Sequence, residues 1–577
     1  MPLAIHDAHR QAVRFRGTRA VEGPMTLGQL NVYKWLRRSA TDRDMPAYAM
    51  QFLSIRPGPA TTVADVADTV DVLVTRHEGL RTLFLDNHRQ CVVDSGEIPL
   101  HVLTVDNATD PVVISKELDD FIQAQPYDST TELPVSVVVA VNADEAVVAG
   151  IMRCSHLAAD HRGLVILGEE IDTMLADPAA RVVGEPRHQP IDQAEAEGSG
   201  PLRQRAANAL SYWRSRLHAM PANPYTGPRR HCAAESGAMT MESLAAARAV
   251  SGIEERTSLN RSTVVLTAVL SVLSERIGSS SHTFPVLSNN RFLDRRLSNY
   301  VGTLAASALV DVDPGWATFD ELGQRVRAAT TRASLSALYD AYQLHGMAEQ
   351  IEHERGIAFN CFPPIFNNAA GYADRITADP TSDATPPIGT APTEFTWRSM
   401  PPTPAPVRFD LWRIDRVLLL DAWTGNTDRV SQEEIRLMLV AVERLLLAAA
   451  DGDLDRHRIS AIVGMAPIER NGGWRLLDSC WVELAEVQRL LDDVLATGCS
   501  LVVGDDDGRP LVAYVAATEE ISTPEAAHAR CMTRVADYPT AITPRHYVLC
   551  DQAPADPGNA SAWRRQHVLS QGPGRIA

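Results

Sequence analysis

The sequence predicts a protein of the mixed α/β class (α/β or α+β), and three observations support this. Apolar residues recur at helical spacing in some segments and alternate or run together in others, along the whole chain. Hydrophobic residues make up 45% and charged residues 22% of the chain, as is typical of globular proteins with large cores. At roughly 100–200 residues per domain, the 577 residues correspond to three or four structural units.

The best-defined elements precede residue 176. Two apolar runs, 134–141 and 146–153, flank the turn-forming segment 142–145 and predict a β-hairpin. Leu164 begins a series of apolar residues at helical spacing. The segment 155–163 is therefore expected to form a loop between a strand and a helix, which is a common position for catalytic groups.

Farther along, the pattern changes several times. The segment 177–201 is rich in Pro, Gly and charge and is predicted to be a linker, and 257–277 is predicted to be a buried helix. The segment 380–406 contains eight prolines, too many for a central strand or helix. The pair Ser431/Glu434 predicts a capping box that opens an amphipathic helix.

The composition excludes several classes of function. The net charge of -18 and the pI near 5.4 disfavour nucleic acid as a partner, because phosphate binding needs a concentrated basic surface. No apolar stretch reaches the ~18 residues of a membrane-spanning helix, and the first residues lack an apolar signal core. We therefore expect a cytoplasmic protein without membrane contact. The eight cysteines include no CxxC pair, which argues against a zinc ribbon, a dithiol redox site or a disulfide scaffold.

The predicted loop 155–163 has the sequence SHLAADHRG. His156, at the end of a strand, presents an imidazole that titrates near neutral pH and is suited to general-base catalysis. Asp160, four residues later, can orient the loop or pair with an arginine. A hydrogen-bonded structural histidine is the alternative, because the spacing HxxxD is frequent by chance.

The same loop resembles the HHxxxDG active-site motif of nonribosomal peptide synthetase condensation domains. Further motifs of that family follow in the family's order: MTLGQ at 25–29, RHEGLRTLF at 76–84, Asn290-Arg291 with YVG at 300–302, and FDLWRIDRVLLLDAWTGNTD at 409–428. The segment 76–84 gives the most specific match, to RHExLRTxF, because nearly every fixed position is filled. The resemblance spans roughly residues 22–455, the length of one condensation domain.

The resemblance implies two chloramphenicol-acetyltransferase-like lobes, at 22–180 and 202–455, that form a V-shaped pseudo-dimer with a central tunnel. An acyl or peptidyl carrier protein would deliver the donor on its phosphopantetheine arm at one end. A small-molecule amine or alcohol acceptor would enter at the other end. The enzyme would have no cofactor and no metal ion of its own.

The resemblance also implies roles for single residues. His156 would be the general base or positioning group, and Asp160 would be structural and pair with an arginine, for which Arg291 is the candidate. Ser155, His161 and Gly163 would contact the substrate. Two positions depart from the motif, because Ser155 replaces its first histidine and His161 replaces the glycine after the aspartate. His161 then indicates an altered acceptor channel, a second functional histidine or a packing role.

The segment 470–577 has a resemblance of its own, to the small C-terminal subdomain of adenylation enzymes. Ala560 stands at the position of that subdomain's adenylate-contacting lysine, and no phosphate-binding Gly-rich loop precedes the segment. We expect a non-catalytic α+β unit that is kept for packing or that docks a carrier protein or partner enzyme.

Together these observations predict a freestanding condensation enzyme of nonribosomal peptide biosynthesis, a route to antibiotics and other secondary metabolites. It would form an amide, with an ester as the alternative. The alternatives are a CoA-dependent acyltransferase of the same superfamily, an epimerising member of the family, and a catalytically silent condensation-like domain that recruits other proteins. The substitutions at Ser155 and His161 favour the silent domain, whereas His156, Asp160 and the intact segment 76–84 favour catalysis.

Overall fold

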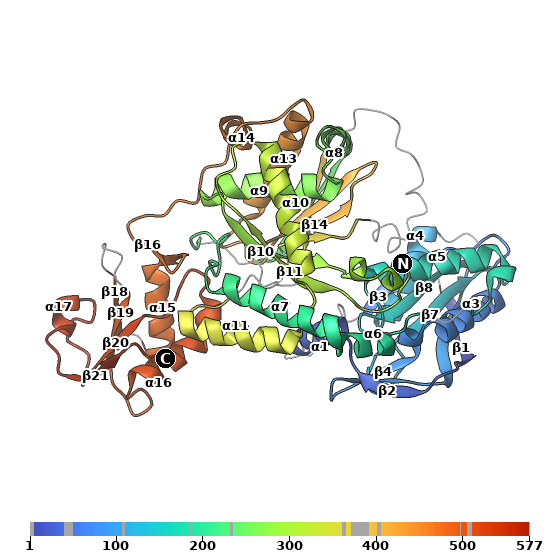
Figure 1. Cartoon of the computed structure of the whole chain (residues 1–577), viewed down its shortest axis with the longest axis horizontal. Helices are drawn as coiled ribbons and strands as arrows, with labels where there is room; N and C mark the ends of the chain where they lie inside the picture. The colour runs from blue at the N-terminus through green and yellow to red at the C-terminus, as the bar shows by residue number, and fades with distance from the viewer. Residues whose placement is uncertain are drawn as a thin grey trace.

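The computed structural model describes residues 5–39, 50–106, 110–184, 187–230, 235–359, 365–370, 392–400, 406–496, 498–504 and 510–575. Three larger sheets, of five, seven and four strands, organise these residues, with helices packed on them (Figure 1). The mixed α/β class expected from the sequence is therefore confirmed. In this described part of the chain, no helix combines the length and apolar character that a bilayer crossing requires.

We call the part built on the five-stranded sheet, residues 5–184, the first lobe. Its strands lie in the order β1-β6-β7-β8-β3, with β6 and β7 parallel and the other neighbours antiparallel. The predicted hairpin is present as β7 and β8. The elements of this lobe are β1 (Ile5–Arg16), β2 (Val21–Pro24), α1 (Leu27–Ser39), β3 (Met50–Ile55), α3 (Val63–Arg76), β4 (Thr82–Leu85), β5 (Arg89–Val92), β6 (Ser95–Val105), α4 (Pro111–Gln123), β7 (Val135–Val141), β8 (Val147–Ser155) and α5 (His161–Ala176).

The part built on the seven-stranded sheet, residues 187–468, is the second lobe. The strand order is β11-β10-β12-β14-β15-β9-β13, and helices α8, α9, α10 and α13 bury one face of the sheet in the largest hydrophobic core. The elements are α6 (Pro190–Glu197), α7 (Gly200–Leu217), β9 (Gly237–Ser243), α8 (Leu244–Thr257), α9 (Arg261–Ile277), β10 (His282–Ser288), β11 (Ala306–Val312), α10 (Phe319–Leu335), α11 (Ala341–Arg355), β12 (Phe366–Asn368), β13 (Glu394–Ser399), β14 (Val407–Arg413), β15 (Leu418–Thr424), α13 (Gln432–Ala450) and α14 (Arg456–Val463).

Residues 470–575 form the C-terminal unit, in which β18-β19-β20-β21 make a four-stranded sheet. Its hydrophobic core is continuous with side chains of α7 and α11, so the unit packs directly on the second lobe (Figure 1). The elements are β16 (Trp474–Leu477), β17 (Cys480–Glu483), α15 (Leu484–Leu495), β18 (Ser500–Val503), β19 (Val512–Ala516), α16 (Pro524–Met532), β20 (His546–Cys550), α17 (Ala560–Trp563) and β21 (Val568–Gly572).

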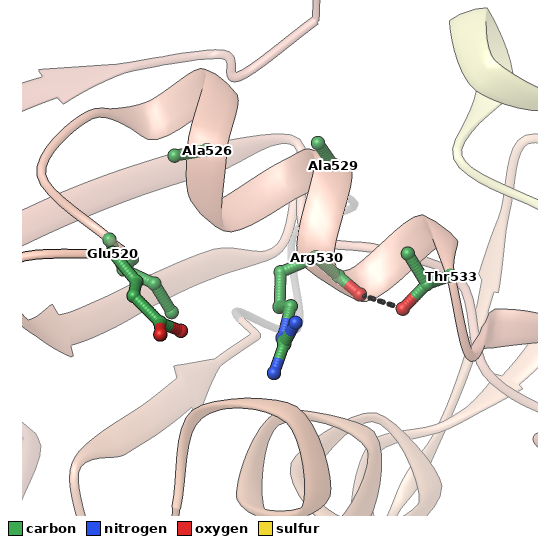
Figure 2. Close-up of a pocket in the computed structure, with 6 residues that line it drawn as sticks. Glu520, Ala526, Ala529, Arg530 and Thr533 are labelled. Atoms are coloured by element: carbon green, nitrogen blue, oxygen red, sulfur yellow. Dashed lines mark hydrogen bonds between the residues drawn. The ribbon is translucent and has the colours of Figure 1, made fainter.

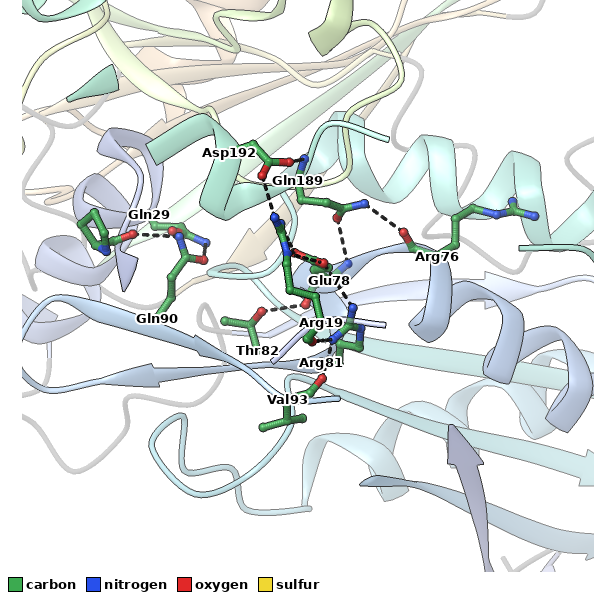
Figure 3. Close-up of polar contacts among 11 residues, drawn as sticks. Arg19, Gln29, Arg76, Glu78, Arg81, Thr82, Gln90, Val93, Gln189 and Asp192 are labelled. Carbon is green, nitrogen blue, oxygen red and sulfur yellow. Dashed lines mark hydrogen bonds and ion pairs between the residues drawn. The ribbon is translucent and has the colours of Figure 1, made fainter. Parts of the chain in front are cut away.

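The segment 76–84, which gave the most specific motif match, contributes to a network of ion pairs and hydrogen bonds in the first lobe (Figure 3). The Glu78 carboxylate accepts hydrogen bonds from Arg19 Nε at 2.9 Å and from Arg81 Nη2 at 3.3 Å. Arg19 also pairs with Asp192 of α6 at 2.9 Å. Glu78 and Arg81 are buried, so the arginines compensate a carboxylate that water does not reach. This motif therefore holds the first lobe to α6 and does not form part of the catalytic loop.

Two sequence predictions concern connecting segments, and the first was wrong. The expected linker 177–201 contains α6 and the start of α7, because Pro190 occupies the first turn of a helix, where proline is favourable as well as in loops. The proline-rich segment 380–406 lies largely outside the described residues, but its proline-free part, 394–399, forms β13. That strand is at the edge of the seven-stranded sheet, where it pairs on one side only.

Two helix starts also differ in detail. The buried helix predicted at 257–277 begins at Arg261, because the Asn260 side chain caps it, and Thr257 instead ends α8. Ser431 caps α13 as predicted, through the N–H of Glu434. The Glu434 carboxylate, however, pairs with Arg276 at 2.6 Å and with Arg230 at 2.8 Å, so only the Ser431 half of the expected capping box forms.

Candidate active site

The candidate catalytic loop connects the last residue of β8 to the first turn of α5. It comprises residues 156–160, so it is shorter than the predicted loop 155–163. Ser155 is fully buried, and its Oγ accepts a hydrogen bond from Leu157 N at 3.3 Å, which turns the chain immediately after the strand. Asp160 caps α5, because its Oδ1 accepts a hydrogen bond from Gly163 N at 2.9 Å.

Asp160 also forms a bidentate ion pair with Arg291, which lies in the second lobe. Nη1 of Arg291 donates to Oδ2 at 2.8 Å, and Nη2 donates to Oδ1 at 2.7 Å. Both side chains are buried, at 2% and 8% exposed. Burial alone would raise the pKa of Asp160, but the Arg291 guanidinium and the donated hydrogen bonds outweigh it and hold the pKa below its usual value. The pair therefore stays ionised and joins the two lobes at the catalytic loop.

The segment 300–305 of the second lobe completes this junction, and we call it the seam. Thr303 Oγ1 donates a hydrogen bond to the carbonyl of His156, and Leu304 N donates to Oδ2 of Asp160 at 3.0 Å. Arg291 Nη2 donates to the carbonyl of Gly302 at 3.2 Å. The seam thus fixes the backbone on both sides of the His156 ring.

The His156 ring lies between two other rings. It packs edge-on against Trp35 of α1, with the ring centroids 6.2 Å apart, and stacks on His161 at 5.9 Å. Its buried Nδ1 finds no hydrogen-bond partner outside its own residue in the described structure. Burial lowers the pKa of His156, opposed by its own backbone carbonyl and by Asp160. At neutral pH the imidazole is therefore uncharged, which is the form that accepts a proton.

His161 occupies the first position of α5 and is half-buried. Burial, together with smaller effects of the nearby His156 and Arg408, lowers the pKa of His161 to about 4. Two neutral imidazoles therefore lie side by side at neutral pH. Ser155 and Gly163 are both buried and are engaged in the turn and in the cap of α5, and their contact with substrate stays a prediction.

A row of side chains on β14 faces the loop from the second lobe, and the sequence prediction did not identify it as part of the site. Arg408 lies close enough to His161 to affect its titration, and Trp412 packs against the core of the first lobe. Asp410 lies between them on the same face of the strand. The available signal was the alternation of charged residues with apolar ones from Val407 to Arg413, which is unusual in a central strand.

Hollows also lie elsewhere among the described residues, and one of about 640 Å³ in the first lobe has Arg14, Arg16, Asp71 and Glu97 as its charged groups. A hollow of about 260 Å³ in the C-terminal unit is bordered mainly by small side chains, with Glu520 and Arg530 as its charged groups (Figure 2). In the part of the chain that the structure describes, no three His, Cys, Asp or Glu side chains are grouped so that they could hold a metal ion. The junction between the lobes is therefore the candidate active site.

Comparison with known proteins identifies a family for this arrangement. The family model for the Condensation domain matches residues 39–370. No curated protein sequence matches the chain. Many solved structures share the fold, and three illustrate their range.

The SgcC5 protein from Streptomyces globisporus, solved with (R)-(-)-1-(2-naphthyl)-1,2-ethanediol and sucrose, superposes with a TM-score of 0.53 at 16% identity and covers 74% of this chain and 99% of its own. A structure that describes the molecular basis for condensation domain-mediated chain release from the enacyloxin polyketide synthase superposes with a TM-score of 0.55 at 17% identity. The match covers 79% of this chain and 86% of the other. The complex of the X-domain and OxyB from teicoplanin biosynthesis gives 0.53 at 16% identity, over 77% and 96%.

Proposed function

This chain belongs to the condensation-domain family, and from that premise we propose that it is an acyltransferase of nonribosomal peptide biosynthesis. It joins an acyl or aminoacyl group, held as a thioester on the phosphopantetheine arm of a carrier protein, to a small-molecule amine or hydroxyl. An amide is the proposed product, with an ester as the alternative. The observation that carries the proposal is the position of His156 at the junction of the lobes, where the Asp160–Arg291 pair and Thr303 hold its loop.

In the proposed reaction, His156 takes the proton of the acceptor amine or hydroxyl as its nitrogen or oxygen attacks the thioester carbonyl. The carbon–sulfur bond then breaks, and the proton passes to the phosphopantetheine thiolate, which leaves as a thiol. A positioned base of this kind accelerates a reaction roughly 10²–10⁴-fold. Holding both reactants in line at the junction of two lobes contributes further, because their translational freedom is already lost on binding.

The other site residues support this step without touching the reacting atoms. Asp160 and Arg291 hold the loop, and Ser155 and Gly163 shape its turn and the cap of α5. His161 presents a second ring beside His156 and is proposed to border the acceptor. The C-terminal unit is proposed to be a non-catalytic remnant of an adenylation subdomain, and the enzyme to be freestanding.

The test is a transfer assay followed by intact-protein mass spectrometry. Acyl-loaded carrier proteins, and the same acyl groups on CoA, are offered with amines and alcohols to the wild type, His156→Ala and His161→Ala. We expect loss of the acyl mass from the carrier and a matching product, both abolished in His156→Ala. Transfer from CoA but not from the carrier would instead support the CoA-dependent alternative. Racemisation of the carrier-bound residue without a new bond would indicate the epimerising branch.

A second candidate is a silent domain that recruits a partner enzyme. The departures at Ser155 and His161 favour it, and so does the shared fold of the X-domain that was solved together with OxyB. If the wild type and His156→Ala were equally inert with carriers that demonstrably bind, this candidate would replace the first.

A further inference from the structure

The face of β14 that points away from the core carries Arg408, Asp410 and Trp412, while the residues between them are buried in the second lobe. Arg408 affects the titration of His161, and Trp412 packs on the core of the first lobe. Because Asp410 lies between these two side chains on the same face, its carboxylate lies where the second lobe meets the catalytic loop.

Only one oxygen of Asp410 has a partner. Oδ1 accepts hydrogen bonds from Nη2 of Arg408 at 2.8 Å and from Nε at 3.1 Å. Oδ2 is buried and has no hydrogen-bond partner among the described residues, and the residue as a whole is 0% exposed. A buried carboxylate oxygen without a donor is unfavourable and rare in folded proteins, so it needs an explanation.

Asp421 provides an internal comparison, because it lies directly opposite Asp410 on β15 and is equally buried. Its Oδ1 accepts a hydrogen bond from Thr240 Oγ1 at 2.6 Å. Its Oδ2 accepts from Trp412 Nε1 at 3.0 Å and from Arg398 Nη2 at 2.6 Å. The fold therefore satisfies one carboxylate of this pair completely and leaves half of the other unsatisfied.

An unpaired donor lies in the same row. Trp423 is opposite Arg408 across the strand pair, and the Arg408 guanidinium carbon lies 5.6 Å from the centre of its ring. The indole Nε1 of Trp423 is buried and has no acceptor in the described structure. Among the described residues, this strand pair thus offers a free acceptor, Oδ2 of Asp410, and a free donor, Nε1 of Trp423. A hydroxyl matches both, because it donates one hydrogen bond and accepts others.

We propose that Asp410 and Trp423 form a subsite for a hydroxyl group of the acceptor that is distinct from its attacking nucleophile. The acceptor class is then a small diol or amino alcohol, with one group at His156 and a hydroxyl held by Asp410 Oδ2. This inference rests on the proposed function, because it places the acceptor at the junction of the lobes. An acceptor without the hydroxyl leaves two desolvated polar groups unpaired, so we expect a preference of about 10- to 100-fold for the hydroxylated acceptor.

Matched probe pairs test this subsite directly. The probes are (R)-1-(2-naphthyl)-1,2-ethanediol against 2-(2-naphthyl)ethanol, and 2-amino-1-phenylethanol against 2-phenylethylamine. Within each pair, the second compound lacks only the hydroxyl on the carbon attached to the aromatic ring. Dissociation constants are measured by calorimetry on the full chain, and transfer rates are measured with loaded carriers. We expect the wild type to bind the hydroxylated member of at least one pair about 10- to 100-fold more tightly.

The variants are designed around the hydrogen-bond roles. In Asp410→Asn, Arg408 holds the amide oxygen, so an NH₂ donor replaces the free acceptor and the preference should disappear. Trp423→Phe removes the free donor from a half-buried residue and should reduce the preference even if Asp410→Asn fails to fold. Asp421→Asn is the matched control, since its carboxylate already has protein partners, and it should keep the preference while lowering the melting temperature.

Each outcome supports or overturns either the subsite or the proposed function. Equal binding of both members of each pair by the wild type, no binding of any probe, or an unchanged preference in a folded Asp410→Asn would overturn the subsite. Transfer by the wild type without any dependence on Asp410 would overturn the subsite alone. A preference that depends on Asp410 without transfer to any acceptor would keep the subsite and overturn the proposed function.

Discussion

At the residue scale, the protonation of His156 is set by its surroundings. The ring is enclosed between Trp35 and His161, and burial lowers its pKa from the ordinary value of 6.5. A histidine with a lowered pKa stays neutral, and therefore able to accept a proton, at pH values where an exposed histidine is already protonated. The unusual His161 adds no positive charge at neutral pH, because its own pKa is lowered to about 4.

This predicts the pH dependence of transfer. As the pH falls, kcat/KM should decline with a midpoint below 6.5, as His156 takes up a proton. The measurement is kcat/KM with one donor and one acceptor between about pH 5 and about pH 8. An acid limb centred above 6.5 would show that the ring is charged more easily than its burial implies.

The Asp160–Arg291 pair predicts a loss of stability on truncation. Asp160→Ala leaves a buried guanidinium unpaired, which costs about 3–5 kcal/mol, and also removes the cap of α5. Unfolding in urea should therefore shift to much lower concentrations. Asp294→Ala, which removes the partner of Arg296 in an exposed pair, is the control and should change the unfolding free energy by less than about 1 kcal/mol. A soluble Asp160→Ala protein that melts normally would contradict this structural role.

The loop residues and the β14 residues differ in how far the sequence could predict them. His156 and Asp160 lie on one loop, so their spacing and their resemblance to a motif were enough to single them out. Arg291 was named as a partner only through the resemblance, because 130 intervening residues separate it from the loop. Asp410 and Trp423 depend on the register of two strands and on which atoms remain unpaired, and no local pattern carries that information.

At the element scale, the packing of α1 against the seam holds the two lobes together. The N-terminal turn of α1 approaches the seam so closely that a Cβ on Gly28 would lie 2.1 Å from the carbonyl oxygen of Thr303. Asn31 Nδ2 donates a hydrogen bond to the carbonyl of Ala305 at 3.2 Å. Farther along α1, Lys34 lies over the ring of Tyr342 in α11, at 4.9 Å.

Two glycine-to-alanine variants distinguish this contact from simple helix propensity. Gly28→Ala forces the seam backbone apart, and overpacking of this kind typically costs about 1–3 kcal/mol. Gly346→Ala, in the exposed middle of α11, meets nothing within 4 Å and should stabilise the chain by roughly 0.5–1 kcal/mol through helix propensity. Urea unfolding of both variants measures the difference. If Gly28→Ala were as stable as the wild type, the close approach at the seam would not contribute to the free energy of unfolding.

Elements with strong local signals were predicted well, and those that depend on distant partners were not. The hairpin of β7 and β8 followed from two apolar runs around a turn, and both strands are central in the sheet. α6 was taken for a linker because its prolines, glycines and charges are also loop residues. Tertiary contacts hold it in place: Ile191 and Ala194 are buried, and Asp192 pairs with Arg19, more than 170 residues earlier in the sequence.

At the scale of the whole molecule, we propose three units built around the three larger sheets, joined in two different ways. The first and second lobes meet through polar contacts at the seam and the catalytic loop, and Val301 and Trp412 of the second lobe add apolar contacts with the core of the first lobe. The second lobe and the C-terminal unit share a more extensive hydrophobic core. Trp213, Leu217 and Ile351 of α7 and α11 lie in the same cluster as Leu490 and Leu491 of α15.

Arg355 strengthens this second junction. It is 5% exposed and donates hydrogen bonds to the carbonyls of Leu217 and Met220 at 2.6 and 2.8 Å, while it pairs with Asp478 of the C-terminal unit at 2.9 Å. A shared core and a buried arginine are typical of a fixed junction and not of a subdomain that swings during catalysis. The packing role expected for this unit therefore has a physical basis in these contacts.

This arrangement predicts that the C-terminal unit cannot be removed without loss. A chain truncated before residue 470 exposes Trp213, Leu217 and Ile351, and each large apolar side chain contributes roughly 1.5–3 kcal/mol when it is buried. It also leaves Arg355 without Asp478. The sum is comparable with the ~5–15 kcal/mol that stabilises a typical domain, so the truncated protein should aggregate or melt far below the full chain. Scanning calorimetry should show the second lobe and the C-terminal unit unfolding in one transition. A truncated protein that melts like the full chain would show instead that the unit is an independent domain.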